Sequence, residues 1–372
     1  MKVICDRAAL VEAMDVVGGV VAQRTPTPVL QCIKLTATDG LLRVAATDLE
    51  VGLHMSVEQV DVVSEGDSLI PADKLRQIVR ASDDSTLTLE TEGHKMHIRG
   101  EDAHFVVYGF DPAEAPTIRG MDDAPVDCEV TARAAQLLIH RTLFAAATEH
   151  SRYAINGVLF DRAKKKIRMV ATDGRRLALA RGDCLSIGEV EAVQCIIPTK
   201  ALTLINKLIT DPDATIRIAI DGTQIIFGIG DGENGAVLVS NLREGAFPPF
   251  EDVIPKDQDK RVTFNPGSLS NAIRRAALLT NDESKGVRMN FADNRLTLTS
   301  RAPELGEAEV QVDLESYEGD PLEIGFNPGF IVDALKVVDG GPVMIELKAS
   351  NKPGVIRTGN DFTYVVMPVN LS

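Results

Sequence analysis

The chain has 372 residues but no tryptophan, and aromatic residues make up only 4% of it. Proteins that hold single-stranded nucleic acid usually stack the bases on aromatic side chains, so this mode of binding is not expected. The five cysteines are scattered and form no Cys-x-x-Cys pair, which favours reduced thiols over a disulfide framework or a zinc site. No apolar run approaches the length of a membrane span. We therefore expect a cytoplasmic protein with no membrane partner, no metal and no other cofactor.

Positive charge is also scarce: 39 Lys and Arg residues stand against 54 Asp and Glu residues, giving a net charge of −15. Such a balance argues against ordinary nucleic-acid binding. Three of the six expected helices, at 131–147, 199–208 and 267–280, nevertheless contain no acidic residue, and the helix at 72–81 is mostly basic. A surface kept positive in this way could meet phosphates without reading bases, and the alternative is ordinary solvated helix faces. The candidate phosphate-contacting residues on these helices are Arg76, Arg80, Arg133, Arg141, Lys200, Lys207, Arg274 and Arg275.

Motifs that carry catalysis are missing as well. The sequence contains neither Gly-x-Ser-x-Gly nor His-Glu-x-x-His. The glycine-rich segment 228–235 precedes a strand-like run and no helix, so we interpret it as a hairpin or a loop between strands and not as a phosphate loop. His94 and His97 lie at an odd offset on strand-like sequence, which puts them on opposite faces of a strand. We predict no catalytic residues and no metal site.

The most informative feature present is the phrase Phe-Asn-Pro-Gly, which occurs at 264–267 and again at 326–329. Asparagine is a good helix N-cap because its side-chain oxygen accepts a hydrogen bond from a free backbone N–H at the helix start. Proline is tolerated at the first helical position. Each copy therefore predicts the start of a helix after a strand.

A longer period, close to one third of the chain, recurs from end to end. Strands that run into a Thr-Asp or similar turn stand at 42–48, 167–173 and 296–300, and late strands stand at 105–108, 237–240 and 364–367. Repetition at this scale indicates similar tandem units. We predict an α+β protein, with two helices against antiparallel sheets in each of three similar domains, at 1–122, 123–255 and 256–372.

Several stretches resemble one family closely, and the likeness covers essentially the whole length. They are 152–160 (Arg-Tyr-Ala-Ile-Asn-Gly-Val-Leu-Phe), 170–178, 285–289, 324–327 and 364–369. The chain resembles the beta subunits of bacterial DNA polymerase III, the replicative sliding clamps. The resemblance implies a non-enzymatic DNA clamp fold, in which a homodimer closes a six-domain ring around double-stranded DNA. Its implied partners are the DNA polymerase III alpha subunit, the clamp loader, and other polymerases and mismatch-repair proteins that bind through a short peptide motif.

The resemblance also implies three sets of site residues. Arg24 is expected to contact DNA, the alternative being a solvated loop arginine. Phe105 and Val107 are expected to meet Leu278 and Leu279 of a second copy, the alternative being internal core. The partner-peptide pocket maps onto Ile155, Thr172, Gly174, Arg175, Arg176, Leu177, Pro248, Val253, Asn327, Phe330, Val366, Met367, Pro368 and Val369. For Leu177 and Val366 the alternative is plain core packing.

The sequence departs from the family at a few positions. Arg175 stands where relatives often have histidine, Ser284 stands where some have an aromatic residue, and the chain ends in Asn370-Leu371-Ser372. These changes bear on partner affinity more than on the fold. Two other classes stay open at this point: an open scaffold of tandem DNA-binding domains, and a hydrolase whose site carries no known motif.

Overall fold

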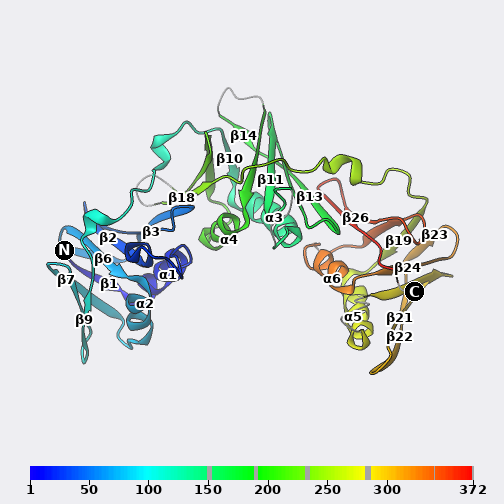
Figure 1. The fold of residues 1–372 in the computed structure, drawn as a ribbon, viewed down its shortest axis with the longest axis horizontal. Helices are drawn as coiled ribbons and strands as arrows, with labels where there is room; N and C mark the ends of the chain where they lie inside the picture. Colours follow the sequence, from blue (N-terminus) through cyan, green and yellow to red (C-terminus); the bar gives the residue numbers. More distant parts are fainter. Residues whose placement is uncertain (149–152, 188–191, 231–234, 281–285, 339, 371–372) are drawn as a thin grey trace. The chain divides into compact units, whose positions relative to one another are not determined.

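The computed structural model describes residues 1–148, 153–187, 192–230, 235–280, 286–338 and 340–370 (Figure 1). Ser284, Leu371 and Ser372, three of the positions where the sequence departs from the family, lie outside these ranges. The fold consists of two compact units. Unit 1 is made of Met1–Gln136, Cys184–Glu191 and Lys200–Leu242, and unit 2 is made of Leu137–Asp183, Ala192–Thr199 and Arg243–Ser372.

The expected helices form close to their predicted positions. They are α1 (Arg7–Val17), α2 (Ala72–Ala81), α3 (Ala132–Thr142), α4 (Thr199–Leu208), α5 (Pro266–Ala276) and α6 (Pro328–Lys336). The two Phe-Asn-Pro-Gly phrases act as predicted, since the Asn265 side chain accepts from the Ser268 N–H (3.1 Å) and Asn327 from the Gly329 N–H (2.9 Å). Short 3₁₀ turns follow two of the helices, so α3 and α5 end earlier than expected.

Unit 1 contains two antiparallel sheets. The larger has nine strands in the order β14 (Leu185–Ser186), β10 (Cys128–Thr131), β16 (Thr215–Asp221), β17 (Gln224–Ile229), β18 (Ala236–Asn241), β4 (Val51–Val57), β3 (Leu41–Thr47), β2 (Cys32–Thr38) and β6 (Gly66–Pro71). The smaller has five strands in the order β5 (Val60–Ser64), β1 (Lys2–Asp6), β7 (Thr86–Glu92), β8 (Lys95–Arg99) and β9 (His104–Tyr108). The β17–β18 pair confirms the predicted hairpin; residues 231–234 between the two strands lie outside the described ranges.

Unit 2 is built in the same way. Its nine-stranded sheet has the order β15 (Ala192–Pro198), β11 (Gly157–Ala163), β12 (Lys166–Thr172), β13 (Arg176–Asp183), β27 (Phe362–Val366), β26 (Gly354–Thr358), β25 (Val343–Leu347), β19 (Lys260–Phe264) and β23 (Ser316–Glu318). Its smaller sheet has four strands: β22 (Gly306–Asp313), β21 (Arg295–Ala302), β20 (Val287–Ala292) and β24 (Leu322–Phe326).

Each nine-stranded sheet joins a five-strand group to a four-strand group. In unit 1 the junction is β18 against β4, and in unit 2 it is β27 against β13. The middle third of the chain therefore contributes strands to both large sheets. The remaining five-strand group ends at β9 and the remaining four-strand group ends at β22, and both strands are sheet edges.

Helices cover one face of these sheets. In unit 1, α1 packs on α2 and against β3 and β4; in unit 2, α5 packs on α6 and against β21 and β22 (Figure 1). The buried apolar residues of these helices include Leu10 and Met14 on α1 and Leu269 and Ile273 on α5. Within the described ranges, no helix is long and apolar enough to cross a membrane.

Candidate functional site

The Thr-Asp turn of the second repeat is fixed by its own side chains. The Thr172 hydroxyl accepts from the Gly174 N–H (3.1 Å) and donates to the carbonyl oxygen of Arg176 (2.7 Å). Asp173 accepts from the N–H groups of Arg175 and Arg176 (2.9 and 3.0 Å). Gly174 adopts a φ of 85°, which glycine tolerates without strain. The turn presents Arg175 to solvent and starts β13 at Arg176.

Arg176 holds several elements of unit 2 together. Its guanidinium pairs with Asp173 (3.0 Å) and Asp333 (2.9 Å) and donates to the carbonyl oxygen of Phe144 (2.8 Å). It also stacks over the Phe330 ring, 4.5 Å from the centroid. Burial lowers its pKa, but the bond to Asp333 and the nearby charge of Asp173 outweigh burial and raise it. Arg176 therefore shapes the predicted pocket and has little capacity left for a ligand.

The C-terminal segment lies between β13 and β24. The Met367 N–H donates to the Arg175 carbonyl oxygen (2.9 Å), and the Val369 N–H donates to the Gly325 carbonyl oxygen (2.9 Å). The first bond continues the β13–β27 pairing beyond the end of β27, and the second ties the segment to β24 of the smaller sheet. The segment from Met367 to Val369 is thus brought beside the Thr-Asp turn, as the resemblance implied.

The predicted pocket residues fall into a buried floor and an exposed rim. Leu177 and Val366 are 3% and 1% exposed, so their alternative interpretation as core residues holds for this conformation. Met367 and Val253 are 41% and 46% exposed, so they form the rim. Of the others, Ile155 and Thr172 are buried, Gly174 and Arg175 are exposed, and Pro248, Asn327, Phe330, Pro368 and Val369 are half-buried.

An apolar cluster on the face of the sheet away from the helices supports this floor. Leu177 packs there with β11, β12 and β15 residues, and the connector that follows β18 covers them with Phe247, Phe250 and Ile254. Arg168 fixes the connector, because its guanidinium donates to Glu251 (2.6 Å) and lies over the Phe250 ring (5.5 Å). Sequence reasoning missed these residues; apolar alternation in the strands was the signal that could have found them.

A cavity of about 640 Å³ adjoins the C-terminal segment. Met367, Pro368 and Val369 line it together with four residues that the sequence did not suggest: Arg288, Glu323, Ser350 and Asn351. Arg288 and Glu323 form an ion pair on neighbouring strands. The rim is therefore bordered by charged and polar groups as well as apolar ones, a mixture typical of sites that bind peptides or small molecules.

The predicted phosphate-contacting residues divide by exposure. Arg24, Lys207, Arg274 and Arg275 are exposed, and no carboxylate lies within ion-pair distance of them in the described part of the chain. Arg133 and Arg80 are also exposed, but they pair with Asp213 (3.6 Å) and Asp15 (2.6 Å). Arg76 is half-buried beside α1.

One of these predictions needs correction, and a second residue is already paired within the chain. Arg141 is only 6% exposed and lies over the Phe362 ring (5.7 Å), so its prediction as a DNA contact is wrong. Its place on the sheet side of α3 was hidden because the sequence does not fix which basic residue of a helix faces inward. Lys200 is held by Asp48 (2.6 Å) and the carbonyl oxygen of Val20 (2.9 Å), which leaves less of its charge for an external phosphate.

The residues expected at a subunit interface lie on one free sheet edge, β9, and in a turn that packs beside the other, β22. Phe105 on β9 is 40% exposed, and Leu278, in the turn after α5, is 77% exposed. Leu279 is half-buried in the same turn, which packs against β21 and β22. Val107 is only 8% exposed and belongs to the core of its own sheet, as its alternative interpretation had it.

The histidines of this sheet do not form a metal site. His97 and His104 stack with ring centroids 5.2 Å apart and share a hydrogen bond between Nδ1 of His97 and Nε2 of His104 (3.0 Å). Within the described ranges, no group of three or more His, Cys, Asp or Glu side chains is arranged to hold a metal ion.

Comparison with known proteins agrees with this geometry. Models of the DNA polymerase III beta subunit match along the whole chain: the N-terminal domain at 1–119, the central domain at 129–249 and the C-terminal domain at 251–370. The beta sliding clamp of Pseudomonas putida is 32% identical over 376 residues, and that of Escherichia coli K12 is 31% identical over 377; both comparisons cover each chain completely. The chain belongs to the DNA polymerase III beta subunit family.

Solved beta subunits have the same fold. A Pseudomonas aeruginosa beta subunit superimposes with a TM-score of 0.88 at 31% identity, and the Bacillus subtilis sliding clamp with 0.90 at 27%. A P. aeruginosa clamp bound to griselimycin reaches 0.91 at 31% identity. Each comparison covers both chains completely. These findings confirm the α+β fold of three tandem domains and the assignment to a non-enzymatic family of sliding clamps.

Proposed function

We propose that this beta subunit acts in the cytoplasm as a ring-shaped homodimer that encircles duplex DNA and tethers DNA polymerase III and other replication and repair proteins. The observation that carries the proposal is the pair of unmatched sheet edges. Two of the three five-strand groups meet a four-strand group within the chain, and the third pair is left apart at β9 and β22.

A second copy of the chain resolves this mismatch. If β9 of one protomer pairs with β22 of the next, a third nine-stranded sheet forms with the same group order as the other two. The contact is head to tail, so two copies close a ring with two such junctions. Pairing also removes exposed backbone donors and acceptors from two edge strands, which would otherwise invite uncontrolled association.

The strand registers specify how the edges meet. The equivalent strand groups of the chain can be aligned from their helix caps by following the paired residues from strand to strand. In this alignment Phe105 on β9 takes the position of Tyr364 on β27, and Ala308 on β22 takes the position of Ala178 on β13. Tyr364 faces Ala178 within the chain. Phe105 is therefore proposed to face Ala308 of the partner subunit, on the side of the sheet that carries the helices.

Charge supports the same pairing. The opposite face of β8 and β9 carries Arg99 directly beside His104, with Lys95 and His97 on the same strand pair. The corresponding face of β22 carries Glu307 and Glu309, both exposed. Complementary charge of this kind favours one orientation of encounter over its reverse.

Exposed basic residues on the helices are the proposed DNA contacts. Arg274 and Arg275 stand in the last turn of α5, and Lys207 near the end of α4. Contacts to phosphates bind without sequence preference and weaken with added salt. Arg274→Glu with Arg275→Glu should weaken retention on DNA most at low salt while leaving the dimer intact. Equal retention of variant and wild type at every salt concentration would remove α5 from the DNA interface.

The pocket beside the C-terminal segment is the proposed partner site. Its apolar rim residues and their polar border suit a short peptide that inserts one or two apolar side chains. Met367→Ala should weaken a labelled peptide from the polymerase alpha subunit by about tenfold, because one truncated anchor costs about 1.4 kcal/mol. Met344→Ala is the matched control, since Met344 on β25 is 38% exposed and lies outside the pocket. Equal losses in the two variants would contradict the assignment.

The decisive experiment concerns ring closure. Phe105→Asp with Leu278→Asp should convert dimers to monomers in sedimentation velocity without loss of secondary structure. Val63→Asp is the control, because Val63 is 55% exposed on β5, at the opposite edge of the same sheet as β9. Wild-type protein loaded on nicked circular DNA should stay bound and should leave when the circle is cut. Retention on linear DNA with free ends would favour the open scaffold instead.

A further inference from the structure

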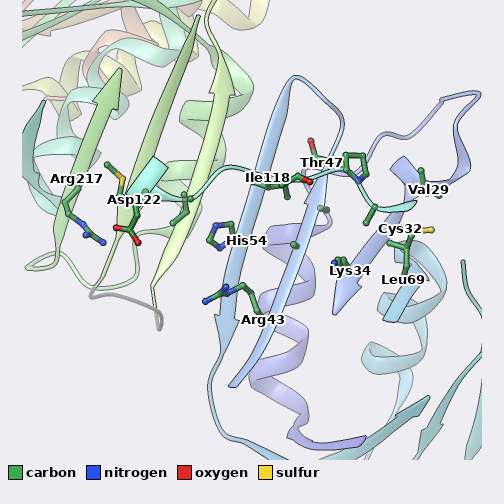
Figure 2. A pocket seen from close by; sticks show the side chains of 18 residues that line it. Val29, Cys32, Lys34, Arg43, Thr47, His54, Leu69, Ile118, Asp122 and Arg217 are labelled. Carbon is green, nitrogen blue, oxygen red and sulfur yellow. The ribbon is translucent and has the colours of Figure 1, made fainter. Parts of the chain in front are cut away.

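A cavity of about 550 Å³ lies on the first nine-stranded sheet, on the face that the connector after β9 crosses (Figure 2). Strands β2, β3, β4, β6, β16 and β18 form its floor and sides, and residues 115–122 of the connector form its wall. All of these residues belong to unit 1. The volume is within the range of small-molecule sites, which is about 300–1,000 Å³.

The strand pairings show which residues make the floor. Ala45 faces His54, and His54 faces Val237 across the junction between the two strand groups. Gly228 on β17 faces Val237 on one side and Arg217 of β16 on the other. These residues form one row across the sheet, and Figure 2 shows the side chains of Arg43 and His54 close together at one part of it.

The second nine-stranded sheet explains why a cavity exists here. The repeated turns align the two sheets, because Thr47 donates to the carbonyl oxygen of Val51 as Thr172 donates to that of Arg176. In this alignment Gly52, His54 and Ala45 take the positions of Leu177, Leu179 and Val170. The three larger residues are core members under the second connector. Ile118 of the connector fills the space over Gly52, whereas the smaller Ala45 and the more polar His54 line the hollow on the first face.

Positive charge gathers around this hollow. Lys34, Arg43 and Arg217 line it. Lys34 pairs with Asp67 (4.0 Å), and the carboxylate among the lining residues is Asp122, which Figure 2 places beside Arg217. In the described part of the chain no carboxylate lies within ion-pair distance of Arg43. Its counterpart in the second sheet, Arg168, is paired with both Asp161 and Glu251. An unpaired guanidinium in a chain of net charge −15 is the kind of group that binds an anion.

His54 supports the same interpretation. Its Nδ1 atom is buried and has no hydrogen-bond partner among the residues that the structure describes. Burial lowers the pKa of His54, and the charge of Arg43 lowers it further, against a hydrogen bond to the backbone of Arg119. The guanidinium and the imidazole are thus close enough to interact, and the site has both a positive potential and a buried polar atom to satisfy.

We propose that this cavity binds a small ligand whose carboxylate or phosphate group contacts Arg43 and His54 and whose apolar body rests on Val29, Leu69 and Ile118. The charge of Arg43 supplies attraction for the anion, and the apolar lining favours a ligand that carries hydrocarbon. The inference does not depend on ring closure, since every residue named belongs to unit 1 of one chain.

The test is a calorimetric titration of the full chain with phenyl phosphate and with benzoate, using phenol as the uncharged control. Saturable binding of an anionic probe at one site per chain, with no binding of phenol, is expected. Arg43→Gln should weaken the binding at least tenfold. Arg168→Gln, the matched change in the second sheet, should leave it within twofold.

A second variant and a second probe guard the result. His54→Leu keeps a side chain of similar size but removes the imidazole nitrogens, and should also weaken binding at least tenfold. Inorganic phosphate should bind at least tenfold more weakly than phenyl phosphate, because it lacks the apolar body. Running benzoate and phenyl phosphate separately tells a carboxylate ligand from a phosphate ligand. The proposal is overturned if neither probe saturates, if Arg43→Gln and Arg168→Gln behave alike, or if inorganic phosphate binds as tightly as phenyl phosphate.

Discussion

The two nine-stranded sheets share one plan and differ in the face that their connectors cross. The first connector follows β9 and the second follows β18, and each begins with the same hydrogen bond to a strand of the sheet that it crosses. The Phe110 N–H donates to the carbonyl oxygen of Leu69, and the Arg243 N–H donates to that of Ile196, each at 2.9 Å. Beyond this bond the second connector lies on an apolar cluster, whereas the first borders a cavity lined by basic residues.

The difference shows that backbone and surface chemistry are set separately in this fold. The strand order, the junction and the turn are the same in both sheets. A few side chains, among them Leu179 in one sheet and His54 in the other, decide whether the connector seals its sheet or leaves a hollow. Function therefore has to be argued from each face, and not from the repeat.

An exchange of these two residues should have the largest effect. Leu179→His puts an imidazole without partners into the apolar cluster and removes buried hydrocarbon, so we expect a loss of about 4 kcal/mol. His54→Leu loses one hydrogen bond but removes a buried, unpartnered nitrogen, and we expect a change within about 1 kcal/mol. Urea unfolding of both variants measures this asymmetry. Similar losses in the two would mean that the two faces are packed alike.

The next largest loss of stability is expected for Arg176, the first residue of β13. Arg176 links Asp173, Asp333 and Phe144, while its counterpart Val51 makes no such network. Arg176→Val leaves Asp173 without its ion pair and Asp333 with Lys336 alone, and it removes a half-buried guanidinium, so we expect about 2 kcal/mol of destabilisation, confined to unit 2. Hydrogen exchange should show faster opening of β12 and β13 and unchanged opening of β3 and β4. Faster exchange in β3 and β4 as well would show that the loss is not local.

A smaller difference in the free energy of unfolding is expected between substitutions of Arg168 and Arg43, which lie at equivalent positions of β12 and β3. Arg168 pairs with Asp161 and Glu251 and covers Phe250, so Arg168→Ala should cost about 1 kcal/mol. Arg43→Ala removes a guanidinium without an ion pair and should leave the free energy of unfolding unchanged within about 0.5 kcal/mol. Denaturant midpoints of the two variants check this, and a larger loss for Arg43→Ala would reveal a structural role that its contacts do not show.

The smallest expected effect is a difference in pH dependence. Because burial and Arg43 lower the pKa of His54 in the fold, the unfolded chain takes up this proton at a higher pH than the folded chain. Stability from His54 is therefore present above its ordinary value, about 6.5, and falls as the pH drops below it. His54→Gln should reduce the loss of unfolding midpoint between pH 7.5 and 5.5. An identical loss in wild type and variant would exclude this contribution.

In unit 2 the corresponding loss of stability occurs over a lower pH range. Burial raises the pKa of Asp333, but its bonds with Lys336 and Arg176 outweigh burial and lower it. Its contribution is present above the ordinary aspartate value, about 3.9, and is lost as the pH falls through the lower folded value. Asp333→Asn should flatten the decline of the midpoint between pH 5 and 3, and an unchanged slope would count against the ion pairs.

Local features of this fold could be predicted from the sequence because they depend on neighbouring residues. Asn265 and Asn327 cap helices where the repeated phrase placed them, and the Thr172 turn stands where the period required it. The division of the middle third between two sheets could not be predicted in this way. It depends on strand pairs far apart in the chain, and alternation of apolar residues does not tell one partner strand from another.

The candidate site, too, could be predicted only in part. Family resemblance pointed to Met367 and Val253, which are exposed on the rim. It did not reveal that Arg176 is occupied by carboxylates or that Arg141 is buried, because burial of a charge depends on packing in three dimensions. The cavity near Arg43 could not be predicted, because its residues come from six strands, a short turn and a connector.

The two junctions have a consequence for how the chain is made. Ser240 pairs with Val51 and Val366 with Arg176, so the paired residues are 240 − 51 = 189 and 366 − 176 = 190 positions apart. At about 5–20 residues per second, a ribosome needs roughly 10–40 s after β4 to synthesise β18, the strand that pairs with it. During that interval β4 is an open edge that carries Val51 and Leu53, which are buried once the sheet is complete. Each repeat thus emerges before the strands that finish its sheet, and the nascent protein depends on whatever shields those edges until the next third of the chain arrives.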